Sequence, residues 1–337
     1  MFGAPSFVSG VIKIVWSFGI VSPYILIMRS FVHRNPVTTF ILMTLGLQFG
    51  IVFGVWLMLA PGAHLHDDPR LHMLFRLRVF GPLVACVGIT WWLERTAGLR
   101  NLFASFLNWR VPVKWYLAAG LWKFLFAYLG IGVVILALGK WPVQGLVLPH
   151  FWDGWLVTLP FIFGIAFVEE TCWMKFCLTR LQMRYSALVS TLIIGNCWGL
   201  WYLPMVAINE GVPPGYPIIV FHGCMISLTI LLAWLYNNTH SGTVLLLAQV
   251  VSNTAFFVAP ILPPNNEIPA GTPTIFPPAA WNNVLLDVDY VTWFSLSFIV
   301  ASVLIVWRAG GRDLGPRPRA RWDEGMPEHS PEFAESA

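Results

Sequence analysis

The segment FVEETCWMKFCLTRLQMRYSALVSTLIIGNCWGLWYLP, residues 167–204, places two adjacent carboxylates, Glu169 and Glu170, inside an otherwise apolar stretch. An ionised carboxylate in a hydrocarbon-embedded helix costs on the order of 2.5–3.5 kcal/mol, so such residues are rare and are functional candidates. Neighbouring side chains on a helix point about 100° apart, so both carboxylates cannot occupy one small polar site. We therefore expect one glutamate to be the reactive group and the other to support it.

The composition of the whole chain is that of a membrane protein. Of its 337 residues, 57% are hydrophobic and only 11% are charged, whereas an ordinary soluble protein has about 25% charged residues. The formal charge of +4 is spread over short loops, and without a basic face nucleic acid is excluded as a partner. All five cysteines lie in apolar segments, which excludes a framework of loop disulfides and favours buried packing roles.

Hydropathy predicts an all-α, polytopic transmembrane helical bundle of about eight or nine spans, each near the ~20 residues that cross a bilayer. The candidate spans are 9–28, 38–60, 79–94, 115–138, 155–179, 187–205, 217–236, 243–262 and 290–307. With nine spans, most arginines fall on one side together with the C-terminus, and the positive-inside rule makes that side the inner one. We therefore expect an integral protein of the cell (cytoplasmic) membrane, surrounded by the lipid bilayer, with its C-terminus inside.

The chain is expected to divide into five parts. N-terminal transmembrane helices occupy 1–94, a core domain occupies 95–262, and the last transmembrane helix occupies 290–307. Between them, 263–289 forms an outer loop that is too rich in proline for a helix or a central strand. The final segment, 308–337, is polar and rich in Arg, Pro and Glu, which predicts a disordered tail.

Three further polar side chains lie in apolar spans that come after the glutamates in the chain. They are Tyr202, Gln249 and Asn253. Gln249 and Asn253 are four residues apart and so share a helix face. At about 1.5 Å of rise per residue, Glu169 and Asn253 lie at similar depths from the inner helix ends, with Tyr202 somewhat deeper. We therefore predict that Glu169, Tyr202, Gln249 and Asn253 line one polar site near the middle of the membrane.

The stretch from EETCWMKFCLTRLQMRYSALV to WGLWYLP, followed by LAWLYNNTHSGTVLLLAQVVSN, resembles the CAAX-processing and bacteriocin-processing (CPBP) membrane protease family. That family includes the type II CAAX prenyl endopeptidase and the abortive-infection proteins, and the resemblance covers roughly 95–255. The chain departs from the family motifs where a methionine replaces an arginine and where a tyrosine and a glutamine replace the two histidines, at Met174, Tyr202 and Gln249.

The resemblance implies a membrane-embedded endopeptidase that acts on prenylated or membrane-associated peptides, with Glu169 as the base that activates water. Its candidate catalytic residues are Glu169, Glu170, Tyr202, Gln249 and Asn253. The last three are neutral hydrogen-bonding groups, and donors of this kind stabilise an oxyanion in a water-poor site. Because both histidines are replaced, two alternatives stay open: an inactive scaffold (a pseudoenzyme) that binds a membrane peptide or a partner, and a repurposed acid–base enzyme acting on a lipid-like small molecule.

No cofactor and no metal are expected, because carboxylates and neutral oxygens are a poor ligand set for zinc and too few for calcium. His222 is interpreted as a core histidine whose ring is hydrogen-bonded inside the protein, since it does not align with either replaced motif histidine. Cys172 adjoins the glutamates but has no histidine placed to activate it as a nucleophile. Lys13 and Lys123 lie in spans and either extend to an interface or pair with a glutamate.

Overall fold

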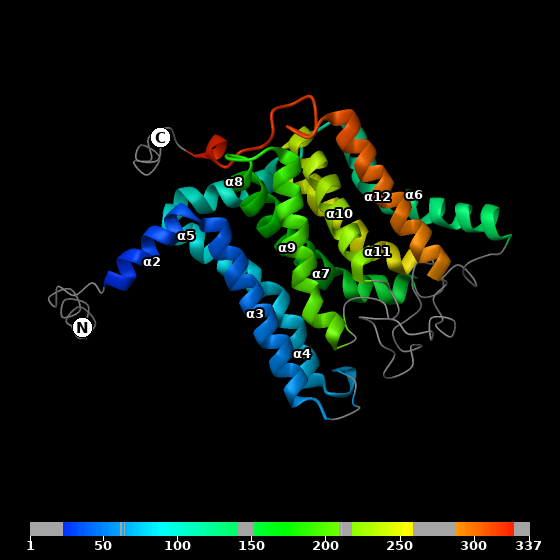
Figure 1. Ribbon diagram of the computed structural model, residues 1–337, viewed down its shortest axis with the longest axis horizontal. Coiled ribbons are helices and arrows are strands. Elements are labelled where there is room, and N and C mark those ends of the chain that lie inside the picture. Colours follow the sequence, from blue (N-terminus) through cyan, green and yellow to red (C-terminus); the bar gives the residue numbers. More distant parts are fainter. Residues whose placement is uncertain are drawn as a thin grey trace, which may run out of the picture.

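The computed structural model describes residues 23–60, 63, 65–139, 151–208, 210, 218–258 and 288–326. These residues form helices joined by turns, and no strand occurs among them (Figure 1). The α-helices are α2 (Pro23–Arg34), α3 (Pro36–Met58), α4 (Pro69–Leu77), α5 (Gly81–Ala104), α6 (Val113–Leu138), α7 (Phe151–Glu169), α8 (Thr179–Leu181), α9 (Ala187–Ala207), α10 (Ile218–Thr239), α11 (Gly242–Val258) and α12 (Val288–Ala309). A π-helix, η5 (Glu170–Leu178), joins α7 to α8, and 3-10 turns are η1 (Leu65–Asp67), η2 (Arg78–Phe80), η3 (Ser105–Leu107) and η8 (Asp323–Gly325).

Within the described part of the chain, five helical segments are long and apolar enough to cross a membrane. They are Pro36–Met58, Pro69–Leu107, Val113–Ala137, Ala187–Val206 and Ile218–Thr239, and shorter apolar helices cover Gly242–Thr254 and Ser295–Ala309. The predicted all-α polytopic bundle is therefore confirmed. The N-terminal part of the first predicted span, 9–28, and nearly all of the Pro-rich loop, 263–289, lie outside the described residues.

The helices are arranged around α9, α10 and η5. α3 packs against α5 and α9, while α9 packs along α10. On the flank away from α3, α6 and α12 lie side by side and cover α10 and α11 (Figure 1). The π-helix lies between α5 and α9, so the segment that carries the two glutamates is enclosed by neighbouring helices.

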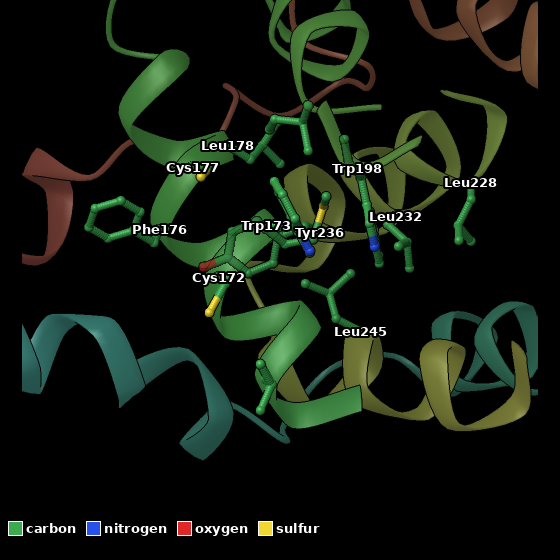
Figure 2. Close-up of a cluster of buried hydrophobic side chains, with 14 of the residues drawn as sticks. Cys172, Trp173, Phe176, Cys177, Leu178, Trp198, Leu228, Leu232, Tyr236 and Leu245 are labelled. Atoms are coloured by element: carbon green, nitrogen blue, oxygen red, sulfur yellow. The ribbon is translucent and has the colours of Figure 1, made fainter. Parts of the chain in front are cut away.

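The interior around η5 is built from aromatic side chains. Trp173 stacks on Trp198 of α9 with ring centroids 5.6 Å apart, and it meets Phe40 of α3 edge-on at 5.5 Å (Figure 2 shows Trp173 and Trp198). Phe176 also contacts Phe40, at 5.4 Å. Aromatic pairs of this kind contribute about 0.5–1.5 kcal/mol beyond the area they bury. They hold η5 in place from two sides.

Helix α5 is longer than the predicted third span, 79–94, and it is interrupted within its length. Arg95 has a φ of 55°, so the chain leaves helical geometry there before it continues to Ala104. Positive φ is uncommon for a side-chain-bearing residue and marks a real change of direction. After this kink, Asn101 and Leu102 turn into the protein interior and are buried.

The prediction of a disordered tail over 308–337 is wrong for the residues up to 326. Residues 310–326, here called the C-terminal strap, cross the ends of η5, α9 and α10, and Trp322 at its far end is fully buried. The indole Nε1 of Trp322 donates to both carboxylate oxygens of Glu94, at 2.9 and 3.1 Å. Asn101 Nδ2 donates to the Trp322 carbonyl at 2.8 Å.

Side-chain amides bind the rest of the strap through its backbone. Asn237 Nδ2 donates to the carbonyl of Asp313 at 2.9 Å, and Gln182 Nε2 donates to that of Ala320 at 2.7 Å. Asn238 Nδ2 donates to the carbonyl of Leu314 at 3.0 Å. Composition alone favours disorder because few apolar residues are present, but buried amides elsewhere satisfy the backbone groups of this polar segment.

Two glycines on α9 allow α10 to approach closely. A Cβ atom at Gly195 would lie 2.7 Å from the Cα of Ile226, and one at Gly199 would collide with the ring of His222. Small residues spaced four apart bring helix backbones together in membranes. The close contact between α9 and α10 therefore depends on these two positions.

We expect Gly195→Ala to destabilise the protein by about 1–3 kcal/mol, because a backbone atom cannot move aside as a flexible side chain can. Gly46→Ala on α3 is the matched control, since a Cβ there meets nothing within 4 Å. Thermal melting of both variants in the same detergent checks the prediction. Equal melting temperatures for the two variants would contradict the proposed role of the α9–α10 contact.

Candidate functional site

The two glutamates lie at the junction of an α-helix and a π-helix. Glu169 is the last residue of α7, and Glu170 is the first of the nine-residue π-helix, all of whose residues are buried. π-helical turns are rare and occur frequently at functional sites. Here the wider turn is accommodated by the packing of Trp173 between Phe40 and Trp198.

Glu169 is the centre of a buried polar cluster. Gln249 of α11 donates a hydrogen bond from Nε2 to Glu169 Oε2 at 2.6 Å, and Glu169 is 7% exposed. The side chains of Tyr202 from α9 and Asn253 from α11 interact with the same carboxyl. The structure thus brings together four of the five predicted site residues, from three helices.

Each amide keeps one polar atom without a well-formed hydrogen bond. Among the described residues, neither Gln249 Oε1 nor Asn253 Nδ2 has a partner of normal geometry, although both atoms are buried. Buried polar atoms are nearly always satisfied by protein or by water. The Asn253 amide therefore has a donor that can serve a group entering the site.

Glu170 is separate from this cluster. It is fully buried, and in the described part of the chain neither of its carboxylate oxygens has a hydrogen-bond partner. Met174, at the position of the family's arginine, is also fully buried and offers no charge. The adjacent glutamates thus occupy different surroundings, and Glu169 is the one that meets the polar side chains.

Helix α6 fixes the position of α11, which sequence reasoning did not foresee. Trp122 Nε1 donates to the carbonyl of Ala248 at 3.1 Å, and Lys123 Nζ donates to the carbonyl of Ser252. These carbonyls belong to the residues just before Gln249 and Asn253, one helical turn apart. Lys123, left open between an interface and a glutamate, therefore holds the helix that carries both amides; Lys13 lies outside the described residues.

Arg78 is a second residue that the sequence did not assign to the site. Its guanidinium is buried, donates to the carbonyl of Phe75 and to the sulfur of Met205, and lies 3.5 Å over the Phe75 ring. Met205 follows Tyr202 by one turn of α9, so this cation lies near the tyrosine. An arginine at the start of an apolar segment is typically an interfacial anchor. The sequence therefore gave no reason to place Arg78 in the protein interior.

The remaining candidates have other partners. His222 Nε2 forms a hydrogen bond with Asn196 Oδ1 at 2.9 Å, on the α9–α10 contact. The thiol of Cys172 is buried and interacts with the thiol of Cys86. Within the described ranges, no group of three or more His, Cys, Asp and Glu side chains could hold a metal. The expectation of no metal and no cofactor stays a prediction.

A comparison with known families agrees with the resemblance inferred from the motifs. Residues 150–255, about a third of the chain, match the family model described as type II CAAX prenyl endopeptidase Rce1-like. No curated protein matches the chain. The matched region contains all five candidate site residues and runs from α7 almost to the end of α11. Trp122, Lys123, Arg78 and the C-terminal strap lie outside it.

Proposed function

We propose that this protein is a membrane-embedded endopeptidase that hydrolyses a prenylated or otherwise membrane-associated peptide, with Glu169 as the general base. The observation that carries the proposal is the 2.6 Å hydrogen bond from Gln249 to Glu169, at the centre of a polar cluster within the region that matches the endopeptidase family. A base needs a fixed position relative to the water it activates, and Gln249 supplies that position.

In the proposed reaction, Glu169 takes a proton from a water molecule as the water oxygen attacks the peptide carbonyl carbon. The carbonyl π electrons move to its oxygen, and neutral donors stabilise the resulting oxyanion. Asn253 Nδ2, which has no well-formed hydrogen bond among the described residues, and the Tyr202 hydroxyl are the candidate donors. The protonated Glu169 then gives its proton to the departing amine as the C–N bond breaks.

The replaced histidines place both proton transfers on one carboxyl. Glutamine and asparagine amides orient and stabilise charge, but they do not exchange a proton at neutral pH. The hydroxyl of Tyr202 carries its proton at neutral pH, so it donates a hydrogen bond but does not take a proton from water. Glu169 is therefore the group on which the proposed chemistry depends.

A second candidate is a catalytically inactive member of the same fold that binds a membrane peptide, a partner or a lipid-like small molecule. It is favoured by the replacement of both motif histidines and by the burial of Glu169, of which 7% is exposed while Gln249 occupies one oxygen. In that case Glu169 is a neutral acid that joins α7 to α11. The two candidates differ in whether a proton acceptor is needed at Glu169.

The proposal also includes the membrane and the orientation. We infer an integral protein of the cell membrane whose C-terminal strap faces the cytoplasm, because the strap and the loops beside it carry most of the arginines. Cysteine labelling at Arg321→Cys in intact and opened cells tests the orientation. Labelling of intact cells by a reagent that does not cross the membrane contradicts it.

We expect Gln249→Leu to lower cleavage of a prenylated peptide panel by roughly 10–100-fold, because the base loses the donor that positions it. Gln48→Leu is the matched control: Gln48 is a buried glutamine on α3 whose Nε2 donates to a backbone carbonyl, that of Trp201, at 2.9 Å. Cleavage is measured in nanodiscs with the full chain. Similar losses in both variants would show that Gln249 acts only through packing.

A further inference from the structure

A pocket lies where α2 meets α3, and none of its lining residues belongs to the Glu169 cluster. Its volume is about 270 Å³, and its other walls come from α5, from α8 and from the turn between α8 and α9. Its ionisable and hydroxyl-bearing lining residues are His33, Arg34, Thr38, Glu94, Arg180, Arg184 and Tyr185. The lining is therefore rich in cations and contains one acid.

The single acid of the lining is already neutralised. Glu94 Oε1 accepts hydrogen bonds from Arg180 Nη2 at 2.8 Å and from the Trp322 indole at 2.9 Å. Arg34 and Arg184 are exposed, and neither forms an ion pair with a described residue. Arg184 Nη2 donates to the backbone carbonyl of Arg34 at 3.4 Å, which holds the Arg184 side chain at the end of α2 beside the pocket. The pocket thus carries a net positive charge.

The first turn of α3 adds the backbone N–H groups of Val37 and Thr38 as donors, whereas Pro36, the first residue of the helix, has none. Asn35 is the residue before α3, but its side chain donates to the Phe31 carbonyl at 3.4 Å and does not cap the helix. The first N–H groups of a helix have no partner within the helix, and the helix dipole makes this end positive. Val37 and Thr38 of that turn line the pocket.

Arg180 provides an independent indication of a ligand. Its side chain lines the pocket with only 9% exposed, and its Nε has no hydrogen-bond partner among the described residues. Nη2 of the same guanidinium is paired with Glu94, but a buried Nε–H that forms no hydrogen bond remains costly. An anion in the pocket would lower that cost and would also meet Arg34, Arg184 and the start of α3.

The position of the pocket identifies the kind of anion. α3 and α9 are both long and apolar enough to cross a membrane, and both begin beside the pocket, at Pro36 and Ala187. The pocket therefore lies at the level where the bilayer meets water. Exposed aromatic residues lie within about a turn of its lining, namely Phe31, Trp91, Trp92 and Tyr185, as expected near headgroups. Its volume lies just below the ~300–1,000 Å³ of pockets for drug-sized ligands, which suits a headgroup rather than a whole lipid.

We propose that this pocket binds the phosphate headgroup of an anionic phospholipid, with Arg34, Arg180, Arg184 and the first turn of α3 as its ligands. The acyl chains would lie outside, against the exposed apolar faces of the neighbouring spans. The proposal is independent of the peptidase proposal, because the pocket shares no residue with the Glu169 cluster.

The test uses the purified full chain in detergent, titrated with phosphatidylglycerol and followed by native mass spectrometry. We expect phosphatidylglycerol to bind at least tenfold more tightly than zwitterionic phosphatidylcholine. In the double variant Arg34→Gln/Arg184→Gln, affinity for phosphatidylglycerol should fall roughly 30-fold, since each arginine near a membrane surface contributes about fivefold. Arg70→Gln, an exposed arginine on α4 at the opposite end of α3 (Figure 1), is the control and should bind like the wild type.

Two outcomes overturn the proposal. The first is equal affinity for phosphatidylglycerol in the double variant, in the Arg70 variant and in the wild type. The second is protection by millimolar inorganic phosphate alone, measured as a rise in melting temperature that the lipid does not increase further. That result would make the pocket a site for a free phosphate and not for a lipid.

Discussion

Glu169→Gln is expected to lower peptide cleavage by roughly 10²–10⁴-fold while the melting temperature holds or rises. Glutamine has the shape and the hydrogen-bonding groups of a protonated glutamic acid, but it cannot accept a proton from water. In the wild-type protein Gln249 donates a hydrogen bond to Glu169 Oε2 at 2.6 Å. The side-chain amide oxygen of the substituted glutamine can accept the same hydrogen bond. The packing of α7 against α11 is therefore kept while the base is removed.

Cleavage of the prenylated peptide panel and a melting curve in the same detergent measure the two effects separately. Glu324→Gln makes the same chemical change at an exposed carboxylate of the strap and should alter neither. If no peptide is cut by the wild type, the native phenotype replaces the cleavage assay. Full function in Glu169→Gln would reject the endopeptidase proposal and leave the inactive scaffold.

A double-variant cycle shows whether Gln249 acts through Glu169 or directly on the substrate. If Gln249 acts by positioning the base, adding Gln249→Leu to Glu169→Gln should lower the residual activity by less than about twofold, because the two changes remove the same contribution. Fully multiplicative losses would mean that Gln249 contacts the substrate directly instead.

Trp322→Ala is expected to destabilise the protein by about 3–5 kcal/mol, as for other fully buried tryptophans. The change opens a cavity against Phe176, whose ring centroid is 6.1 Å away, and removes the cation–π contact with Arg180, whose Cζ lies 3.9 Å above the indole. It also removes the indole N–H that donates a hydrogen bond to the Glu94 carboxylate. A loss of this size is a large share of the ~5–15 kcal/mol stability of an ordinary domain.

The matched control is Trp307→Ala on α12, which makes the same substitution at a tryptophan that is 80% exposed. Its melting temperature should stay close to the wild-type value, whereas that of Trp322→Ala should fall steeply. Trp322→Phe separates the two contributions, since it keeps most of the ring and removes only the indole donor. Equal melting of Trp322→Ala and Trp307→Ala would show that the strap is not part of the folded core.

The spans and the Glu169 cluster could be predicted because their signals are local. A carboxylate or an amide in an apolar stretch needs a polar partner, and few other polar residues share its depth, so Glu169 and Gln249 could be paired from hydropathy and spacing. The motif resemblance added the same residues independently. The adjacent Glu170 shows the limit, because helical spacing separates it from Glu169 but does not say what surrounds it.

The partners of Lys123 and Arg78 could not be predicted, because they are backbone carbonyls and apolar or thioether side chains far along the chain. The contacts of the strap could not be predicted either, because they join its backbone and one indole to side chains far away in the sequence. Lys123 donates to the backbone carbonyl of Ser252. Because every residue has such a carbonyl, the sequence does not indicate which one a lysine will bind. The composition of the strap predicts disorder, because it is dominated by polar residues and does not show that one tryptophan, Trp322, is fully buried. The two side chains that bind the strap backbone, Gln182 and Asn237, lie in the segments LTRLQMRY and WLYNNT, within the stretch that resembles the family.

The strap has a consequence for how the protein is made. Glu94 and Trp322 are 228 positions apart in the chain, and at a synthesis rate of roughly 5–20 residues per second Glu94 waits about 10–50 s for its indole partner. During that interval the ends of η5, α9 and α10 that the strap crosses lack the segment that covers them, with Gln182, Asn237 and Arg180 uncovered. The nascent bundle is therefore exposed to proteolysis and misassembly late in its biogenesis, and a tag or a premature stop before Trp322 should reduce the yield of protein rather than its specific activity.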